Sequence, residues 1–193
     1  MNLLLSLLLL AAPAIKTEYG RFNIIKDGKT IGTDEFTISR HESNYVLEGK
    51  TTIGDMTITS RIEVTEKLIP VSYESKSAGG TIRVSIASPV SELQTIVNGE
   101  TSSANFRFPE DGVILDNNIF DHYLILMYRV QTGEKTFAVF VPQDRRLGGA
   151  TVKSTGPRMY DLQIGDVKMQ ATVDADGALT KLSVPAANVV VER

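Results

Sequence analysis

The chain has 193 residues, a formal net charge of −3, two histidines and no cysteine. A chain of this length is long enough for one domain with its own hydrophobic core. The small and dispersed negative charge excludes the basic stripe typical of nucleic-acid-binding proteins, so no nucleic-acid partner is expected. The lack of cysteine excludes disulfide bonds and cysteine-ligated metals.

The first 14 residues have the features of a secretory signal peptide. Leu3–Leu10 forms an apolar core, and small residues precede a predicted cleavage site after Ala14. This apolar stretch is shorter than the ~20 residues that a membrane-spanning helix needs. We therefore expect a single β-rich domain over residues 15–193, without a transmembrane segment. Export without disulfides is typical of the bacterial envelope, which predicts a periplasmic or secreted bacterial protein.

Short runs of alternating apolar and polar residues fill most of the remaining chain, as expected for antiparallel strands with one wet face. Asp27-Gly28, Asn98-Gly99 and Asp176-Gly177 indicate tight hairpin turns. The strands predicted before residue 110 are 18–25, 30–40, 45–53, 55–66, 69–76, 81–87, 92–97 and 101–108. Those predicted later are 136–141, 151–154, 158–164, 167–173, 179–184 and 188–192, and Pro142–Gly149 is predicted to be a polar, basic loop.

Asp116–Val130 is the one stretch with helical periodicity. Its apolar residues recur at the spacing of one helical face, and the helix is expected at about 118–130. Asn118 is predicted to cap the first turn, with Asp121 reaching back in the manner of a capping box. The predicted fold class is mainly β: an antiparallel curved sheet, a half-barrel or barrel meander, with this helix packed on the concave face. An immunoglobulin-like sandwich is the second choice.

Catalytic and metal-binding patterns are sparse. His41 falls in a predicted turn, whereas His122 lies on the predicted helix beside Asp121 and could serve a hydrolase as its base. The chain has no G-x-S-x-G motif to supply a nucleophile, and Asp174-Ala175-Asp176-Gly177 lacks the downstream glutamate of a calcium loop. Arg145-Arg146 could hold an anion. No catalytic residue, metal or cofactor is predicted.

A curved sheet beneath a helix either closes tightly or encloses an apolar pocket. The side chains that could line such a pocket are apolar or amphipathic residues of the predicted inner faces and of the helix; the same residues could instead form an ordinary packed core. The candidates are Met56, Ile58, Tyr73, Phe106, Phe120, His122, Tyr123, Met127, Arg129 and Phe137.

Three loose motifs resemble those of a family of uncharacterised secreted bacterial β-rich proteins. They are a Y-x5-G-x3-G hairpin, here Phe22–Gly32, a P-x-x-Y-x strand start at Pro70–Glu74, and an L-D-N…H…L…R segment from Leu115 to Arg129. Such proteins are similar in outline to the envelope lipoprotein carriers, in which a half-barrel holds acyl chains beneath a helical lid. The predicted export, the missing catalytic constellation and the helix-covered curved sheet together predict a non-enzymatic protein that binds a lipid, another apolar ligand or an envelope partner protein. The alternatives are a hydrolase using His122 and a structural module of an envelope assembly.

Overall fold

The computed structural model describes residues 15–133 and 135–193, so the predicted signal peptide lies outside the described residues. Within them, fifteen strands, one α-helix and one 3-10 turn are present. The first eight strands are β1 (Glu18–Lys26), β2 (Lys29–His41), β3 (Asn44–Ile53), β4 (Met56–Val64), β5 (Pro70–Ser77), β6 (Gly80–Ser85), β7 (Ser91–Val97) and β8 (Glu100–Phe106). After them come β9 (Val113–Ile114), α1 (His122–Gln131), β10 (Thr136–Val141), β11 (Arg146–Gly156), β12 (Met159–Ile164), β13 (Val167–Val173), β14 (Leu179–Val184), η1 (Pro185–Ala187) and β15 (Val189–Glu192).

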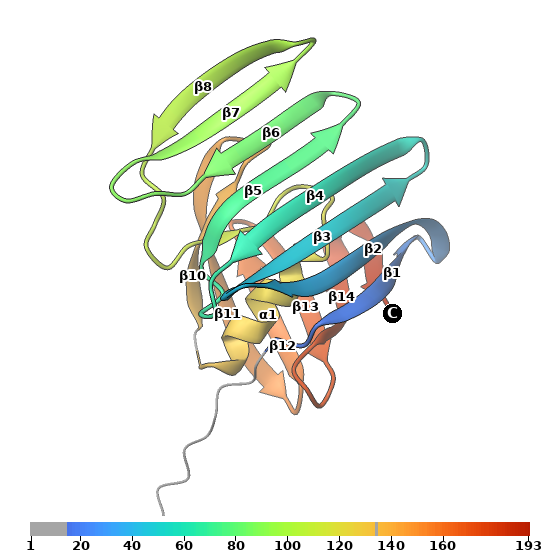
Figure 1. Ribbon diagram of the computed structural model, residues 1–193. Helices are drawn as coiled ribbons and strands as arrows, with labels where there is room; N and C mark the ends of the chain where they lie inside the picture. Colours follow the sequence, from blue (N-terminus) through green and yellow to red (C-terminus); the bar gives the residue numbers. More distant parts are fainter. Residues whose placement is uncertain (1–14, 134) are drawn as a thin grey trace, which may run out of the picture.

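All of these strands belong to one curved sheet that wraps around α1 (Figure 1). Consecutive strands pair from β1 to β8 and from β9 to β15, and β1 joins β15, so that the two halves meet in the middle of the sheet. The sheet does not close, because β8 and β9 remain at its two ends. The prediction of a mainly β, curved sheet with a helix on its concave face is confirmed.

One pair of strands departs from the predicted antiparallel meander. β9 runs parallel to β10, pairing Val113 with Val139 and Ile114 with Phe140. Parallel neighbours cannot be joined by a tight turn and need a crossover connection. The helix α1 lies between β9 and β10 in the chain and provides that crossover, which brings it into the concavity.

The helix is almost entirely buried. Leu124, Leu126 and Met127 have no exposed surface, and they belong to a continuous core with the inward side chains of both halves of the sheet. Such burial is what holds a ten-residue helix together, since isolated helices of this length are marginal in water. None of the helices among residues 15–133 and 135–193 is long and apolar enough to span a membrane.

The boundaries differ from the prediction in three places. The helix begins at His122 rather than near Asn118, which lies in a turn with a positive φ of 60°. The stretch Arg146–Gly149, predicted as loop, is the first part of β11 and pairs with β10. The two-residue strand β9 has no counterpart in the prediction, because two residues are too few to show a period.

Candidate functional site

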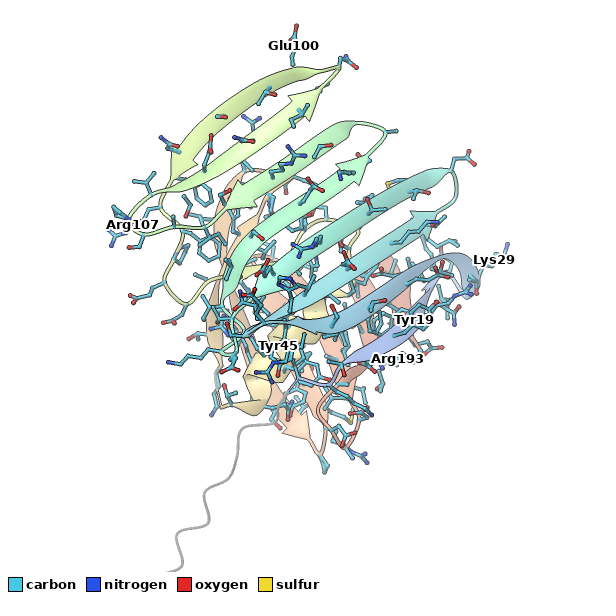
Figure 2. The ribbon with its side chains drawn as sticks, viewed as in Figure 1. Tyr19, Lys29, Tyr45, Glu100, Arg107 and Arg193 are labelled. Atoms are coloured by element: carbon cyan, nitrogen blue, oxygen red, sulfur yellow. The ribbon has the colours of Figure 1, made fainter. Side chains whose placement is uncertain are left out.

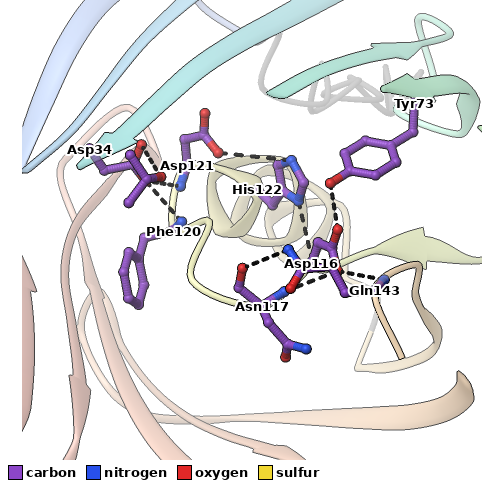
Figure 3. A network of polar contacts seen from close by, with 9 residues as sticks. Asp34, Tyr73, Asp116, Asn117, Phe120, Asp121, His122 and Gln143 are labelled. Atoms are coloured by element: carbon purple, nitrogen blue, oxygen red, sulfur yellow. Dashed lines mark hydrogen bonds and ion pairs between the residues drawn. The ribbon is translucent and has the colours of Figure 1, made fainter. Parts of the chain in front are cut away.

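The start of the helix is held by an acidic residue from a distant strand. Asp34 on β2 accepts hydrogen bonds from the backbone N–H groups of Phe120 and Asp121, both at 2.8 Å to Oδ2 (Figure 3). Its other oxygen accepts a hydrogen bond of 3.1 Å from the hydroxyl of Thr51 on β3. A carboxylate at the positive end of a helix dipole is favourable. Asp34 therefore supplies the cap expected from Asn118, and Asp121 makes no capping hydrogen bond.

A second buried carboxyl group anchors the loop before the helix. Asp116 accepts a 2.6 Å hydrogen bond from the hydroxyl of Tyr73 on β5, and a 3.0 Å bond from the backbone N–H of Gln143. Its own backbone N–H donates to Nδ1 of His122 at 3.4 Å. The His122 ring also packs edge-on against Tyr73, with ring centroids 5.4 Å apart. These contacts join β5, the start of the helix and the β10–β11 loop into one polar network inside an apolar core (Figure 3).

Within the part of the chain that the structure describes, two neighbouring side chains of this network have polar atoms without hydrogen-bond partners. Both carboxyl oxygens of Asp121 and Nε2 of His122 are fully buried and unsatisfied, with Asp121 Oδ1 lying 3.9 Å from His122 Nε2. The Asp121 carboxyl lies against Gly49 on β3, where a β-carbon would overlap Asp121 Oδ2 and lie 2.8 Å from the Ser60 hydroxyl. Gly49 therefore leaves the space that the buried carboxyl occupies.

Burial shifts the pKa of three side chains in this region, Asp34, Asp121 and His122. It raises the pKa of Asp34 to about 6, although the backbone N–H groups oppose this shift. Burial and the nearby charge of Asp34 raise the pKa of Asp121 well above its usual range. Burial lowers the pKa of His122 to about 3, so its imidazole is neutral at pH 7. The network thus favours a neutral Asp121 beside a neutral His122.

These shifts make opposite contributions to the pH dependence of stability. The folded protein keeps protons on Asp34 and Asp121 that the unfolded chain releases, so their contribution is full below about pH 4 and is lost as the pH rises through the folded-state pKa values. His122 binds its proton more weakly when folded, so its contribution is full above about pH 6.5 and is lost as the pH falls toward 3.

Asp121→Asn should separate these effects, because asparagine cannot ionise. We expect the stability of the variant, relative to wild type, to increase with pH above about pH 4, with a slope of up to ~1.4 kcal/mol per pH unit for each proton concerned. Urea unfolding measured from pH 4 to pH 8 tests this, with Asp166→Asn on the exposed surface as the matched control. A stability difference that stays constant with pH would show that Asp121 ionises normally.

Next to the network, the concave face of the sheet is hollowed into a groove of about 430 Å³. It extends from β4 to β7 and is bounded on the helix side by Asn118 and Gln143. Gln143 also belongs to the polar network, through its backbone N–H to Asp116. The lining combines three large apolar side chains, Met56, Ile58 and Ile82, with the hydroxyl-bearing residues Thr57, Ser75, Ser77, Thr81 and Thr95. We refer to this hollow as the β4–β7 groove.

An arginine from the opposite half of the sheet lies at one end of this groove. Arg145, in the loop between β10 and β11, donates a 3.1 Å hydrogen bond to the hydroxyl of Thr95 on β7. On its other side is a smaller hollow of about 170 Å³, lined by Leu93, Ala104, Phe106, Phe140, Arg145 and Leu147. Larger hollows of about 450, 570 and 610 Å³ exist elsewhere, but their linings include no residue of the buried network. The β4–β7 groove is therefore our candidate site.

The predicted pocket residues do not converge on one place. Met56 and Ile58 line the β4–β7 groove, Phe106 lines the smaller hollow, and Phe137 lines a separate shallow hollow beside β11. Phe120 and Tyr123 are half-buried around the helix start. The remaining four candidates, which are buried, are Tyr73, His122, Met127 and Arg129.

The contacts of Arg129 are of a kind that holds the fold together. Its guanidinium donates to the backbone carbonyls of Gly112 and Asp111 at 3.2 and 3.1 Å, and it lies 5.2 Å from the centre of the Phe137 ring. It thereby fixes the connection between β8 and β9 to the helix. His122 likewise has no exposed surface, and among the described residues its ring accepts a hydrogen bond only from a backbone N–H.

Sequence reasoning missed the roles of Asp34, Thr51, Gly49 and Gln143. A signal for Asp34 was present, because it alternates in register with Phe36 and Ile38, both of which face the core. A charged residue in the inward set of a strand is unusual and needs a partner. No comparable signal marks Gln143, whose position depends on how the β10–β11 loop folds over the sheet.

No protein-family model, no curated protein and no solved structure matches this chain.

Proposed function

We propose that this chain is a non-enzymatic periplasmic or secreted bacterial protein that binds an amphipathic, largely apolar ligand in the β4–β7 groove. The proposal rests on one observation: the helix leaves part of the concave face of the sheet uncovered. There, Met56, Ile58 and Ile82 offer apolar surface among hydroxyl groups, in a hollow of about 430 Å³. Ligand sites of this kind are concave, apolar and furnished with a few polar groups.

The polar ends of the groove support an amphipathic ligand over a purely apolar one. Gln143 and Asn118 supply amide groups on the helix side, and Arg145 lies at Thr95. A ligand with an acyl chain and a carboxylate or hydroxyl head group would match this distribution. The part of the concavity occupied by α1 is filled with core side chains, so the proposed ligand lies beside the helix and not beneath it.

The periplasmic or secreted location in this proposal rests on the signal-like sequence of Met1–Ala14 and on the absence of cysteine. Among the described residues, nothing in the surroundings of His122 favours the alternative hydrolase. Its ring is fully buried, and no hydroxyl nucleophile is hydrogen-bonded to it.

Fluorescence titration of residues 15–193 with cis-parinaric acid tests the proposal. We expect saturable binding to wild type and a Kd at least about tenfold higher for Ile82→Glu, since that change places a carboxylate among the apolar side chains of the groove. Val167→Glu introduces the same charge at an exposed site on β13 that does not line the groove, and this variant should bind the probe like wild type.

Equal Kd values for Ile82→Glu and Val167→Glu would place the probe outside the β4–β7 groove. A wild-type protein that does not bind the probe would contradict the apolar-ligand proposal itself.

A further inference from the structure

The edge strand β8 is exposed to an unusual degree. Six of its seven residues are exposed and only Phe106 is half-buried. It is the last strand of the sheet at this end, and among the described residues it pairs with β7 alone. β8 contains no proline, no lysine and no register shift, which are the features that usually protect an edge from pairing with another strand. The opposite edge is different, since β9 is only two buried residues long.

The hairpin register shows which backbone groups of β8 face outward. A two-residue turn at Asn98 and Gly99, with φ of 54° and 82°, joins β7 to β8 and places Val97 opposite Glu100. In this type of hairpin the closing pair is hydrogen-bonded, and bonded and non-bonded pairs then alternate along the strands. The residues of β8 whose N–H and C=O groups point away from β7 are therefore Thr101, Ser103 and Asn105.

We infer that β8 pairs with β8 of a second copy of this chain, antiparallel and around a two-fold axis at Ser103. Ser103 is the middle residue of the strand, so this register uses the whole edge. It places Thr101 opposite the partner's Asn105, and Ser103 opposite the partner's Ser103. The outward N–H and C=O groups of each such pair then bond to one another, which extends the sheet across both molecules.

The charges at the two ends of β8 support a second copy as the occupant. Glu100 begins the strand and Arg107 follows its last residue, so opposite charges lie at its two ends (Figure 2). A two-fold axis brings the beginning of one strand to the end of the other. In this register Glu100 lies opposite the partner's Phe106, the residue next to the partner's Arg107, so opposite charges come close at both ends of the pair and favour this register. The side chains between them are small or polar and place no like charges together.

An edge of seven residues buries little surface, so the dimer should be weak and concentration-dependent. Interfaces below ~1,200 Å² in total are typical of transient complexes. Sedimentation velocity over a range of concentrations should show a monomer that converts to a dimer as the concentration rises. Ser103→Lys should remain a monomer over the same range, because the two ammonium groups would face each other across the axis.

The absence of cysteine from the chain permits a direct test of the register. Ser103→Cys should form a disulfide-linked dimer on mild oxidation, because paired residues at the axis lie about 5.5 Å apart between α-carbons, within the range for a disulfide. Thr101→Cys is the matched control on the same strand. Its two cysteines would be separated by four residues of strand, about 13 Å, and should not cross-link. Combining Thr101→Cys with Asn105→Cys should restore cross-linking.

Three results would overturn the inference. A wild-type chain that stays monomeric at all concentrations would leave the edge without a second copy. Cross-linking of Thr101→Cys as fast as Ser103→Cys would indicate another register or random collision. A Ser103→Lys protein that is folded by circular dichroism and still dimerises would place the interface on another surface.

Discussion

Replacing Leu124 with alanine should lower the free energy of unfolding by ~2–5 kcal/mol, a large part of the stability of a typical domain. Leu124 has no exposed surface and lies on the buried helix, where the sheet surrounds it on the concave side. Removing its side chain leaves a cavity that the neighbouring strands cannot fill without distorting their pairing. Urea or thermal unfolding of the purified variant measures the loss.

Lys168→Ala on β13 is the matched control. Lys168 is exposed on the outer face of its strand, and its replacement should change stability by less than ~0.5 kcal/mol. If the helix were instead a mobile lid, Leu124→Ala would weaken binding of cis-parinaric acid and leave the melting temperature nearly unchanged. That pattern would contradict the central role assigned to the helix in the core.

Asp34→Ala should destabilise the fold by roughly 2–5 kcal/mol, because it leaves the buried N–H groups of Phe120 and Asp121 without an acceptor. The expected loss exceeds that of an ordinary helix cap on a protein surface, ~0.5–2 kcal/mol, since water cannot replace the lost acceptor at a residue with no exposed surface. Chemical denaturation at pH 7 gives the comparison with wild type.

Asp34→Asn provides a sharp control at the same position. Its amide oxygen can still accept the two N–H groups, and its amide nitrogen can donate to the hydroxyl of Thr51. It also removes a buried charge, so its stability should be close to that of wild type at pH 7. Equal losses for Asp34→Ala and Asp34→Asn would show that the negative charge, and not the acceptor, holds the start of the helix.

The strands of this protein were largely predictable from the sequence, because side chains alternate strictly between the two faces of a strand. Met169, Ala171 and Val173 on β13 are buried while Lys168 and Gln170 between them are exposed, as the alternation indicated. Glycine after asparagine or aspartate at positions 28, 99 and 177 marked the hairpin turns, and all three glycines have positive φ. These signals are local, and tertiary contacts reinforce them.

The helix was predictable in kind but not in its beginning. Its apolar periodicity is local, whereas its capping acceptor, Asp34, comes from a strand 86 residues earlier than Phe120. A nearby Asn118 offered the standard local signal, but it lies in a left-handed turn that directs the chain from β9 into the concavity. Which acceptor satisfies the first N–H groups of a buried helix depends on which strand lies beside it.

The start of β11 likewise could not be predicted from the local sequence. Gly148 and Gly149 have little intrinsic strand preference, which favoured a loop in the sequence. In the folded chain they pair with Val139 and Ala138 of β10, because a backbone ladder needs only N–H and C=O groups and an adjacent strand.

Local sequence patterns were enough to predict the β-rich class, the order of the strands and most of the inward side chains, since each follows from residues close together in the chain. Three features became apparent only in the folded chain: β9 runs parallel to β10, the helix fills one part of the concavity, and the sheet stays open at β8. Folding also brings Asp34 close to Asp121 and His122, and it places Gln143 at the β4–β7 groove. These outcomes depend on contacts between residues tens of positions apart, and the curvature of the whole sheet decides which of those residues come within reach.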